Sequence, residues 1–371
     1  VGIAVVVFFN LRFGWVLSGL VVPGYLVPLL LAKPAAAFVV VGEGIATYGL
    51  VWFYSEYLSA RLGWSNFFGR DRFFALVLCS ILVRIIADGF LLPSFGEWLN
   101  QTVQLQFDYR NNLHSFGLII VALIANNFWK TGLARGVLPL VVTVGITLLI
   151  VRYVLMPATN FNISSLSYAY EDIATSMLAS PKAYIILIVT AFLASRMNLL
   201  YGWDFSGILV PSLLALQWYQ PGKIAASFLE AGVIILLAHA LLKLPVFASM
   251  TIEGGRKLLL FFNISYFYKF VLAYLMLWLW PEQKITDLYG FGYLLPTLIA
   301  LKMHDKGIYA RMTRATLQTS LVAALGATAV GFSLSFMPDI GELTATRQAE
   351  KPVSAEIGKE TLLEALRREK I

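Results

Sequence analysis

The chain has 371 residues, of which 59% are hydrophobic and 13% are charged, and its mean hydropathy is +0.76. An ordinary soluble domain is about half apolar and about a quarter charged, so this composition excludes a chain that folds mainly in water. The net charge of +7 does not indicate a nucleic-acid partner, because no basic stripe is interleaved with exposed aromatic residues. The positive excess indicates membrane orientation instead.

Six long apolar stretches follow one another along the chain and predict membrane-spanning helices. Each is about 18–25 residues long, the length that a helix needs to cross about 30 Å of hydrocarbon. A buried helix of a soluble core is the alternative for any one of them, but not for so many in series. The stretches are 35–58, 73–93, 136–156, 183–200, 224–242 and 258–280.

An internal repeat divides the chain into two tandem units. The run NLRFGWVLSGLVVP at 10–23 matches NLLYGWDFSGILVP at 198–211 with a constant offset of 188, and 116–132 matches 291–307 with an offset of 175. Because the order is preserved, we expect two copies of one unit. The predicted parts are repeat one (1–157), an extracytoplasmic linker (158–181), repeat two (182–337) and a polar C-terminal tail (338–371).

A weaker similarity relates the two halves of each repeat. Both the first motif (Gly19, Pro23) and the later one (Gly292, Pro296) contain glycine, two apolar residues and proline in the same order. The pattern predicts inverted halves with short helices broken by glycine and proline, an arrangement common in transporters. The alternative is a simple Gly/Pro kink in an ordinary span. The predicted fold is therefore an all-α polytopic membrane protein of two parallel repeats, each of two inverted halves.

Counting lysine and arginine in short connections predicts the orientation. If the short segments at 13–32, 114–129, 205–219 and 290–301 also cross, basic residues gather on one side, which is then cytoplasmic. Each repeat would cross six times, and both ends of the chain and the tail would lie outside the cytoplasm. If the short segments are re-entrant and do not cross, this assignment of the cytoplasmic side is lost. Val1 aligns with Val189, inside a helix of repeat two, so we also expect upstream residues in the natural protein.

Ionisable residues inside predicted spans are candidate functional groups, because burying a charge in hydrocarbon is costly. Glu43 and Glu230 occupy corresponding positions at an offset of 187. They are candidates for a proton, ion or substrate contact, or for structural hydrogen bonds. Arg84 and Lys269 form a basic counterpart that would contact an anion, pair with these acids or extend towards a span end. Asp88, one turn after Arg84, is placed to neutralise it.

Two further groups complete the candidate site. The glycine and proline segments, with their free N–H groups and helix dipoles, predict an anion-binding substrate path near the midplane. Basic residues at the cytoplasmic ends of the spans predict an entrance or docking surface, although orientation alone would also explain them. The path residues are Gly19, Pro23, Gly117, Asn126, Gly207, Pro211, Gly292 and Pro296, and the basic residues are Arg12, Arg70, Arg196 and Arg256.

The sequence offers no catalytic or redox apparatus. It contains no phosphate-binding P-loop, no nucleophile elbow and no His-Glu-x-x-His pair. Cys79 is the only cysteine, and the three histidines lack metal-ligand spacing. We therefore expect a non-catalytic chain without a metal or cofactor. Any ATP-driven chemistry must come from another chain.

Three landmarks together resemble the PgsC/CapC family of poly-γ-glutamate (capsule) biosynthesis membrane proteins. They are the run SGLVVPGYL at 18–26, Gly69-Arg70 followed by Arg84, and the segment from Phe116-Gly117 to Gly132. Family members are about the size of one repeat, so the chain resembles two such proteins fused. A related group, seven-helix membrane domains fused to an inactive transglutaminase, is the alternative. Val121, where the family usually has proline, is a departure, and it suggests that the two copies have specialised.

The resemblance implies a membrane subunit in the bacterial cytoplasmic membrane that works with an ATP-dependent amide ligase, either Mur-ligase-like or ATP-grasp, and an extracytoplasmic accessory subunit. Together they would make or export an anionic polymer or peptide. The basic loops 61–72, 130–135, 243–257 and 302–314 would dock the ligase. The alternatives are an autonomous ion-coupled transporter of a small carboxylate and a non-conducting scaffold.

Overall fold

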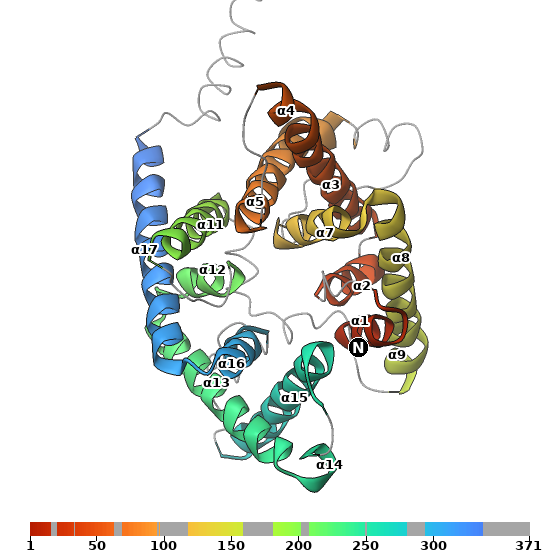
Figure 1. Ribbon diagram of the computed structural model, residues 1–371, viewed down its shortest axis with the longest axis vertical. Helices are drawn as coiled ribbons and strands as arrows, with labels where there is room; N and C mark the ends of the chain where they lie inside the picture. Colours follow the sequence, from red (N-terminus) through yellow and green to blue (C-terminus); the bar gives the residue numbers. More distant parts are fainter. Residues whose placement is uncertain are drawn as a thin grey trace, which may run out of the picture. The chain divides into compact units, whose positions relative to one another are not determined.

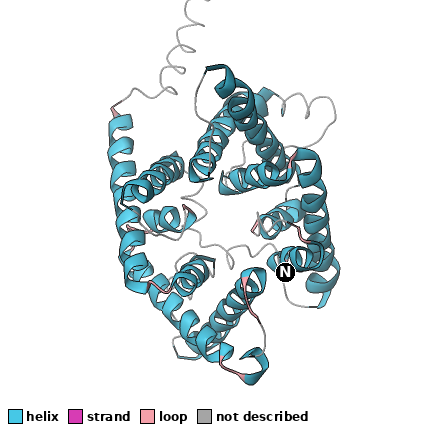
Figure 2. Cartoon of the chain, in the orientation of Figure 1, coloured by secondary structure: helices cyan, strands magenta, loops and turns pink. Residues whose placement is uncertain are grey.

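The computed structural model describes residues 1–15, 21–32, 34–62, 69–94, 96, 118–158, 181–201, 208–248, 251–279 and 294–336. Within these ranges every regular element is a helix (Figures 1 and 2). The chain divides into two compact units, Val1–Gly326 and Ala327–Ile371. The predicted linker, from 159 to 180, and the tail from 338 onwards lie outside the described residues.

The described part of repeat one contains six principal helices. Three of them, α3, α5 and α8, continue through π-helical turns, labelled η, which often mark functional sites. The bounds are α1 Gly2–Phe13, α2 Val22–Ala32, α3 Pro34–Trp52 with η1 Phe53–Leu58 and α4 Ser59–Leu62, α5 Gly69–Ile86 with η2 Ala87–Leu91, α7 Leu118–Thr131, and α8 Leu133–Ile150 with η4 Val151–Leu155 and α9 Met156–Ala158.

Repeat two presents corresponding helices in the same order. They are α11 Pro181–Tyr201, α12 Leu209–Leu216, α13 Pro221–Leu242 with the short α14 Pro245–Ala248, α15 Gly254–Leu279, α16 Leu294–Lys306 and α17 Tyr309–Ser335. The turn before the last helix is also shared, because Gly132 and Gly307 both have positive φ, at 79° and 65°. A positive φ favours glycine, which explains why both repeats carry it at this turn.

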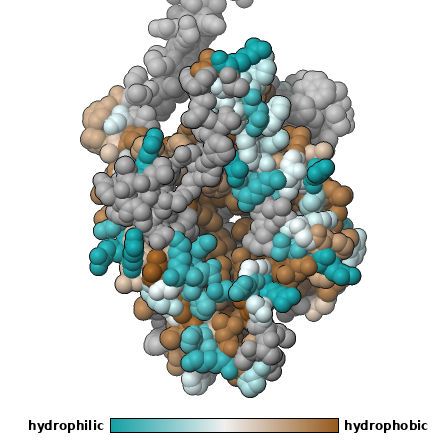
Figure 3. Space-filling view, in the orientation of Figure 1, coloured by the Kyte–Doolittle hydropathy of each residue, from teal (hydrophilic) through white to brown (hydrophobic). Residues whose placement is uncertain are grey.

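Six of the described helices are long and apolar enough to cross a membrane, three in each repeat. They are Pro34–Leu58, Arg72–Ser94, Leu133–Ala158, Pro221–Leu242, Gly254–Met276 and Tyr309–Ser333. Their outward-facing side chains are apolar and exposed, as a lipid-facing surface requires; Leu138 is 62% exposed and Leu229 is 72% exposed. Figure 3 shows such hydrophobic residues beside clusters of hydrophilic ones. The chain is thus an all-α polytopic membrane protein.

The glycine and proline segments form short helices in the part that is described. Proline stands in the first turn of α2, α12 and α16, where its missing N–H removes no helical hydrogen bond. The 11 residues of α2 span about 16 Å, roughly half the hydrocarbon thickness. These prolines therefore begin short helices instead of kinking long ones. The prediction that these segments cross also involves residues outside the described ranges.

Each repeat has its own apolar core at equivalent helices. In repeat one, α3 packs against α5 and α7, and α2 packs against α7; in repeat two, α13 packs against α15 and α16, and α12 packs against α16. The short helices contribute directly, because Leu26 of α2 shares a core with Ile124 of α7, and Leu214 of α12 shares a core with Ile299 of α16. The two short segments of each repeat therefore contact one another in the described residues.

The repeats contact one another through two equivalent pairs of helices. The first helix of repeat one, α1, packs against α15, and its counterpart α11 packs against α5. Val77 and Ile81 of α5 form a buried cluster with Leu187 and Ala191 of α11. A pair of copies related by a two-fold axis produces such reciprocal contacts. Most of both predicted repeats therefore lies in the unit Val1–Gly326.

Candidate functional site

A buried ion pair lies at the centre of repeat one. Arg84 on α5 donates from Nη1 to Oε2 of Glu43 on α3 over 2.8 Å, and the two side chains are 1% and 4% exposed. Glu43 is nine residues from each end of α3, which places it about 13 Å along a helix of about 28 Å. Arg84 lies 12 residues after the start of the span Arg72–Ser94, near its midpoint, so the pair sits inside the spans, where an unpaired charge is costly.

A second carboxylate joins this pair. Asp88 lies in the π-helical turn η2, and its Oδ2 accepts a hydrogen bond from Arg84 Nε over 3.1 Å. Its side chain is 36% exposed, in contrast to the enclosed Glu43. Arg84 also interacts electrostatically with Tyr184 of α11, across the contact between the repeats. Within the described residues, the cluster contains two carboxylates and one guanidinium, so their summed formal charge is −1.

Close packing of α3 on α7 surrounds the pair. A Cβ added at Gly44, next to Glu43, would lie 2.7 Å from Cγ2 and 3.0 Å from Cβ of Ile124. Only a residue without a side chain allows the two helices to approach this closely. The sequence signal for this position, the run Gly-Glu-Gly at 42–44, did not by itself reveal that packing.

Repeat two carries an equivalent ion pair. Lys269 Nζ on α15 lies 3.0 Å from Glu230 Oε2 on α13, with side chains 11% and 7% exposed. The helices that hold it, α13 and α15, correspond to α3 and α5. Asp88, however, aligns with Ala273 at the offset of 185 that relates Arg84 to Lys269. In the part of the chain that the structure describes, the second cluster has one acid and one base, so its formal charge is zero.

In the structure the four ionisable residues pair with one another, and direct contact of Arg84 or Lys269 with an anion stays a prediction. Arg84 and Lys269 pair with Glu43 and Glu230 respectively, which was the alternative to direct contact with an anion. Asp88 bonds to Arg84 as its one-turn spacing predicts. The repeated acids and bases therefore form two matched pairs that join the central helices of each repeat.

The remaining predicted site residues divide into three groups. Pro23, Pro211 and Pro296 are buried at the starts of short helices, and Asn126 is half-buried on α7. The start of α2 lies beside the C-terminal half of α7, because Pro23 and Asn127 line one cavity, and Arg135 in the first turn of α8 lines the same cavity. Gly19, Gly117, Gly207 and Gly292 lie outside the described residues.

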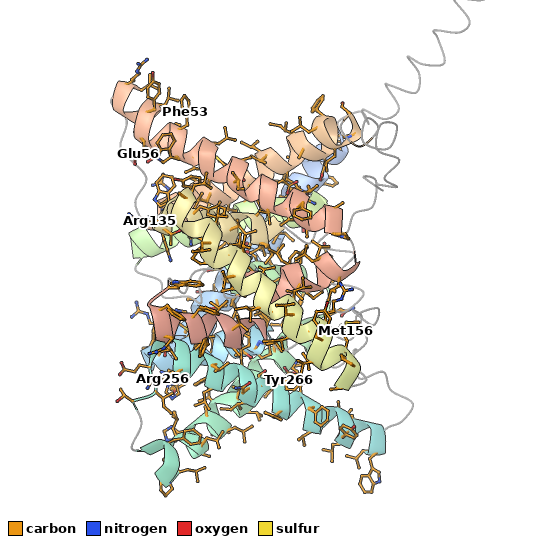
Figure 4. The ribbon with its side chains drawn as sticks, turned by 90° about the vertical axis from the view of Figure 1, so that its right-hand side faces the viewer. Phe53, Glu56, Arg135, Met156, Arg256 and Tyr266 are labelled. Carbon is orange, nitrogen blue, oxygen red and sulfur yellow. The ribbon has the colours of Figure 1, made fainter. Side chains whose placement is uncertain are left out.

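The predicted basic entrance is exposed where it is described. Arg12, Arg196 and Arg256 are exposed, whereas the side chain of Arg70 lies outside the described residues. Figure 4 shows Arg135 of repeat one and Arg256 of repeat two at the same end of the molecule, with Met156 at the opposite end. This agrees with counting both arginines on one side of the membrane. In the described residues, no group of three histidine, cysteine or acidic side chains could hold a metal ion.

The helices and paired charges define a polytopic membrane protein made of two copies of one helical unit. A family model described as capsule biosynthesis CapC matches residues 1–137 and 189–312, and the chain belongs to this family. The matched segments begin at 1 and 189, an offset of 188, and end at 137 and 312, an offset of 175. Both offsets are those of the internal repeat, so the tandem duplication is confirmed. Neither the curated proteins nor the solved structures gave a match.

Proposed function

We propose that the chain is the membrane subunit of a complex that makes and exports a poly-γ-glutamate-type polyamide across the bacterial cytoplasmic membrane. It anchors a cytoplasmic ATP-dependent amide ligase and passes the anionic product outward, with an extracytoplasmic accessory subunit. The observation that carries the proposal is the capsule biosynthesis family match over both repeats. Export of an acidic polymer also fits the exposed arginines at one end of the spans.

The two charged clusters support different roles for the two repeats. The cluster around Arg84 has a formal charge of −1, so it repels a carboxylate, and its buried pair of Arg84 and Glu43 holds α5 and α3 together. The pair of Lys269 and Glu230 is neutral and slightly more exposed than the pair of Arg84 and Glu43. A passing carboxylate can replace Glu230 as the partner of Lys269 at lower electrostatic cost. Repeat two is therefore the better anion path, and repeat one is the more rigid support.

The same pairs favour this function over an autonomous transporter driven by Glu43 and Glu230. A carboxylate that already neutralises a cation 2.8–3.0 Å away is less suited to carry a proton or a second cation. Binding of a proton or a second cation to Glu43 or Glu230 would leave the buried positive charge of Arg84 or Lys269 less well neutralised.

Purification from the native host in mild detergent, followed by mass spectrometry, tests the proposal. We expect an ATP-dependent amide ligase to copurify, and we expect Arg12→Glu with Arg256→Glu to lower its recovery. Arg152→Glu is the control, because this exposed arginine lies near Met156 at the opposite end. Repeated recovery of the chain without a ligase would contradict the proposal. Equal loss in the control would contradict the docking surface.

A further inference from the structure

A cavity of about 590 Å³ lies in repeat one, between α1, α2, α7 and α8. Its walls are largely apolar and include Val6 and Phe9 of α1, Ile124 of α7 and Leu140 of α8. Its polar lining comes from Asn127, Lys130, Thr131, Arg135 and Thr143. The cavity thus combines an apolar wall with a localised cationic region, and it is separate from the ion pairs of the membrane midplane.

The cationic region is suited to an anion. Lys130 lies in the last turn of α7 and Arg135 in the first turn of α8, on either side of Gly132, whose φ is 79°. No acidic side chain lines the cavity, and neither cation has an ion-pair partner within the described part of the chain. Both side chains are exposed and free to turn towards a ligand. Two cations beside a helix N-terminus favour a phosphate group.

The surroundings of the cavity favour a lipid over a soluble anion. On α8, Leu138 and Val141 are 62% and 61% exposed, and on α1, Phe8 is 59% exposed, so both flanking helices present apolar faces outward. Phe9 stacks on Trp15 with ring centroids 4.6 Å apart, and both rings line the cavity. Aromatic rings beside basic residues are typical of the membrane–water interface. Acyl chains can therefore follow the apolar wall while a headgroup meets the cations.

Repeat two carries a different arrangement of charges at the equivalent positions. At the offset of 175, Asp305 replaces Lys130 and Ala310 replaces Arg135, while Lys302 and Lys306 replace Asn127 and Thr131. Asp305 forms an ion pair of 2.5 Å with Lys257 of α15. The equivalent place in repeat two therefore carries an acid and an internal ion pair where repeat one carries two cations.

We propose that the cavity between α1, α2, α7 and α8 binds an anionic phospholipid. Lys130 and Arg135 hold the phosphate, and the walls of Phe9, Ile124 and Leu140 accept part of the acyl chains. The site goes beyond the proposed export function and does not depend on it. Basic pockets between membrane helices recognise anionic headgroups in this way.

Trp15 provides a built-in reporter for the test. The purified protein is reconstituted in vesicles of phosphatidylcholine that contain either dibrominated phosphatidylglycerol or dibrominated phosphatidylcholine, because bromine quenches nearby tryptophan fluorescence. The difference between the protein and its Trp15→Phe variant isolates the signal of Trp15. We expect phosphatidylglycerol to quench this signal more strongly than phosphatidylcholine at equal bromine content.

Lys130→Gln with Arg135→Gln should remove that preference. Each cation near a membrane surface contributes about 1 kcal/mol, so the apparent affinity for phosphatidylglycerol should fall about tenfold or more. The matched control is Lys302→Gln with Arg314→Gln, which removes two exposed positive charges from repeat two and should keep the preference. Equal quenching by both lipids, or an equal loss in both double variants, would overturn the proposal.

A competition arm distinguishes the lipid from an acidic polymer. Soluble poly-glutamate added to the same vesicles should leave the quenching by phosphatidylglycerol unchanged. Displacement of the lipid at low salt, absent in the Lys130→Gln and Arg135→Gln double variant, would show that the cations bind an acidic polymer instead, and it would refute the lipid site.

Discussion

Replacing Arg84 with methionine should destabilise the protein far more than removing an exposed arginine. The substitution preserves an unbranched side chain but leaves the Glu43 carboxylate, 4% exposed, without the guanidinium 2.8 Å away. Removing one partner of a buried ion pair costs about 3–5 kcal/mol. Arg152→Met, at an exposed position, should change stability by only about 0.5 kcal/mol.

The geometry also predicts an order among the single variants. Glu43→Gln should cost less than Arg84→Met, because Asp88 still accepts from Arg84 Nε at 3.1 Å and compensates the remaining cation. The double variant of Glu43→Gln with Arg84→Met should recover most of the loss, since Asp88 is 36% exposed and can reach water or headgroups. The costs of two residues in one ion pair are not additive.

Unfolding by sodium dodecyl sulfate from mild detergent measures these differences, with the loss of the monodisperse peak on heating as a second readout. A cost of this size should lower the midpoint temperature of Arg84→Met by about 5 °C or more. The reasoning is refuted if Arg84→Met is as stable as Arg152→Met. It is also refuted if the double variant loses the sum of the two single losses.

Three further predictions concern packing, backbone conformation and pH. Gly44→Ala should lower the free energy of unfolding by about 1–3 kcal/mol through overpacking against Ile124. The double variant with Ile124→Ala should lose less stability than the sum of the two single variants. Additive losses in thermal unfolding would argue against the close approach of Gly44 and Ile124. Gly132→Ala should cost about 1–3 kcal/mol, because φ 79° with ψ 153° suits glycine almost alone, and an unchanged midpoint would contradict this. Burial, and then the ammonium group of Lys257, lower the pKa of His304, so the unfolded state binds its proton more readily. Stability should therefore be full above pH about 6.5 and fall as the pH drops below that value, and His304→Gln should weaken the fall; an identical pH profile for this variant would rule the group out.

The sequence predicts the fold class and the repeat because both depend on regular patterns. Span length and hydropathy are properties of continuous segments, and the 188-residue offset preserves whole motifs such as that ending at Pro23 and Pro211. The constant order of helices in the two repeats follows from the same duplication. The short length of α2 and α12 was harder to predict from the sequence. Proline can either begin a helix or kink a longer one, so its presence alone does not distinguish the two.

The sequence identifies the four buried ionisable residues, but it does not show which of them form ion pairs. Glu43 and Arg84 are 41 residues apart, and their contact depends on how α3 and α5 rotate about their axes when Gly44 packs on Ile124. No periodicity in either helix encodes that rotation. The cavity beside Lys130 was inaccessible for a similar reason, because four separate helices build it.

The most direct test of the proposed function is the extracellular polymer of a deletion strain. The native host lacking this chain would be complemented with the wild-type protein or with an empty vector, and the anionic polymer outside the cells would be hydrolysed and quantified. The proposal predicts a glutamate-containing polyamide that is lost on deletion and restored by the wild-type chain. An unchanged amount of such a polymer outside the deletion strain would contradict it.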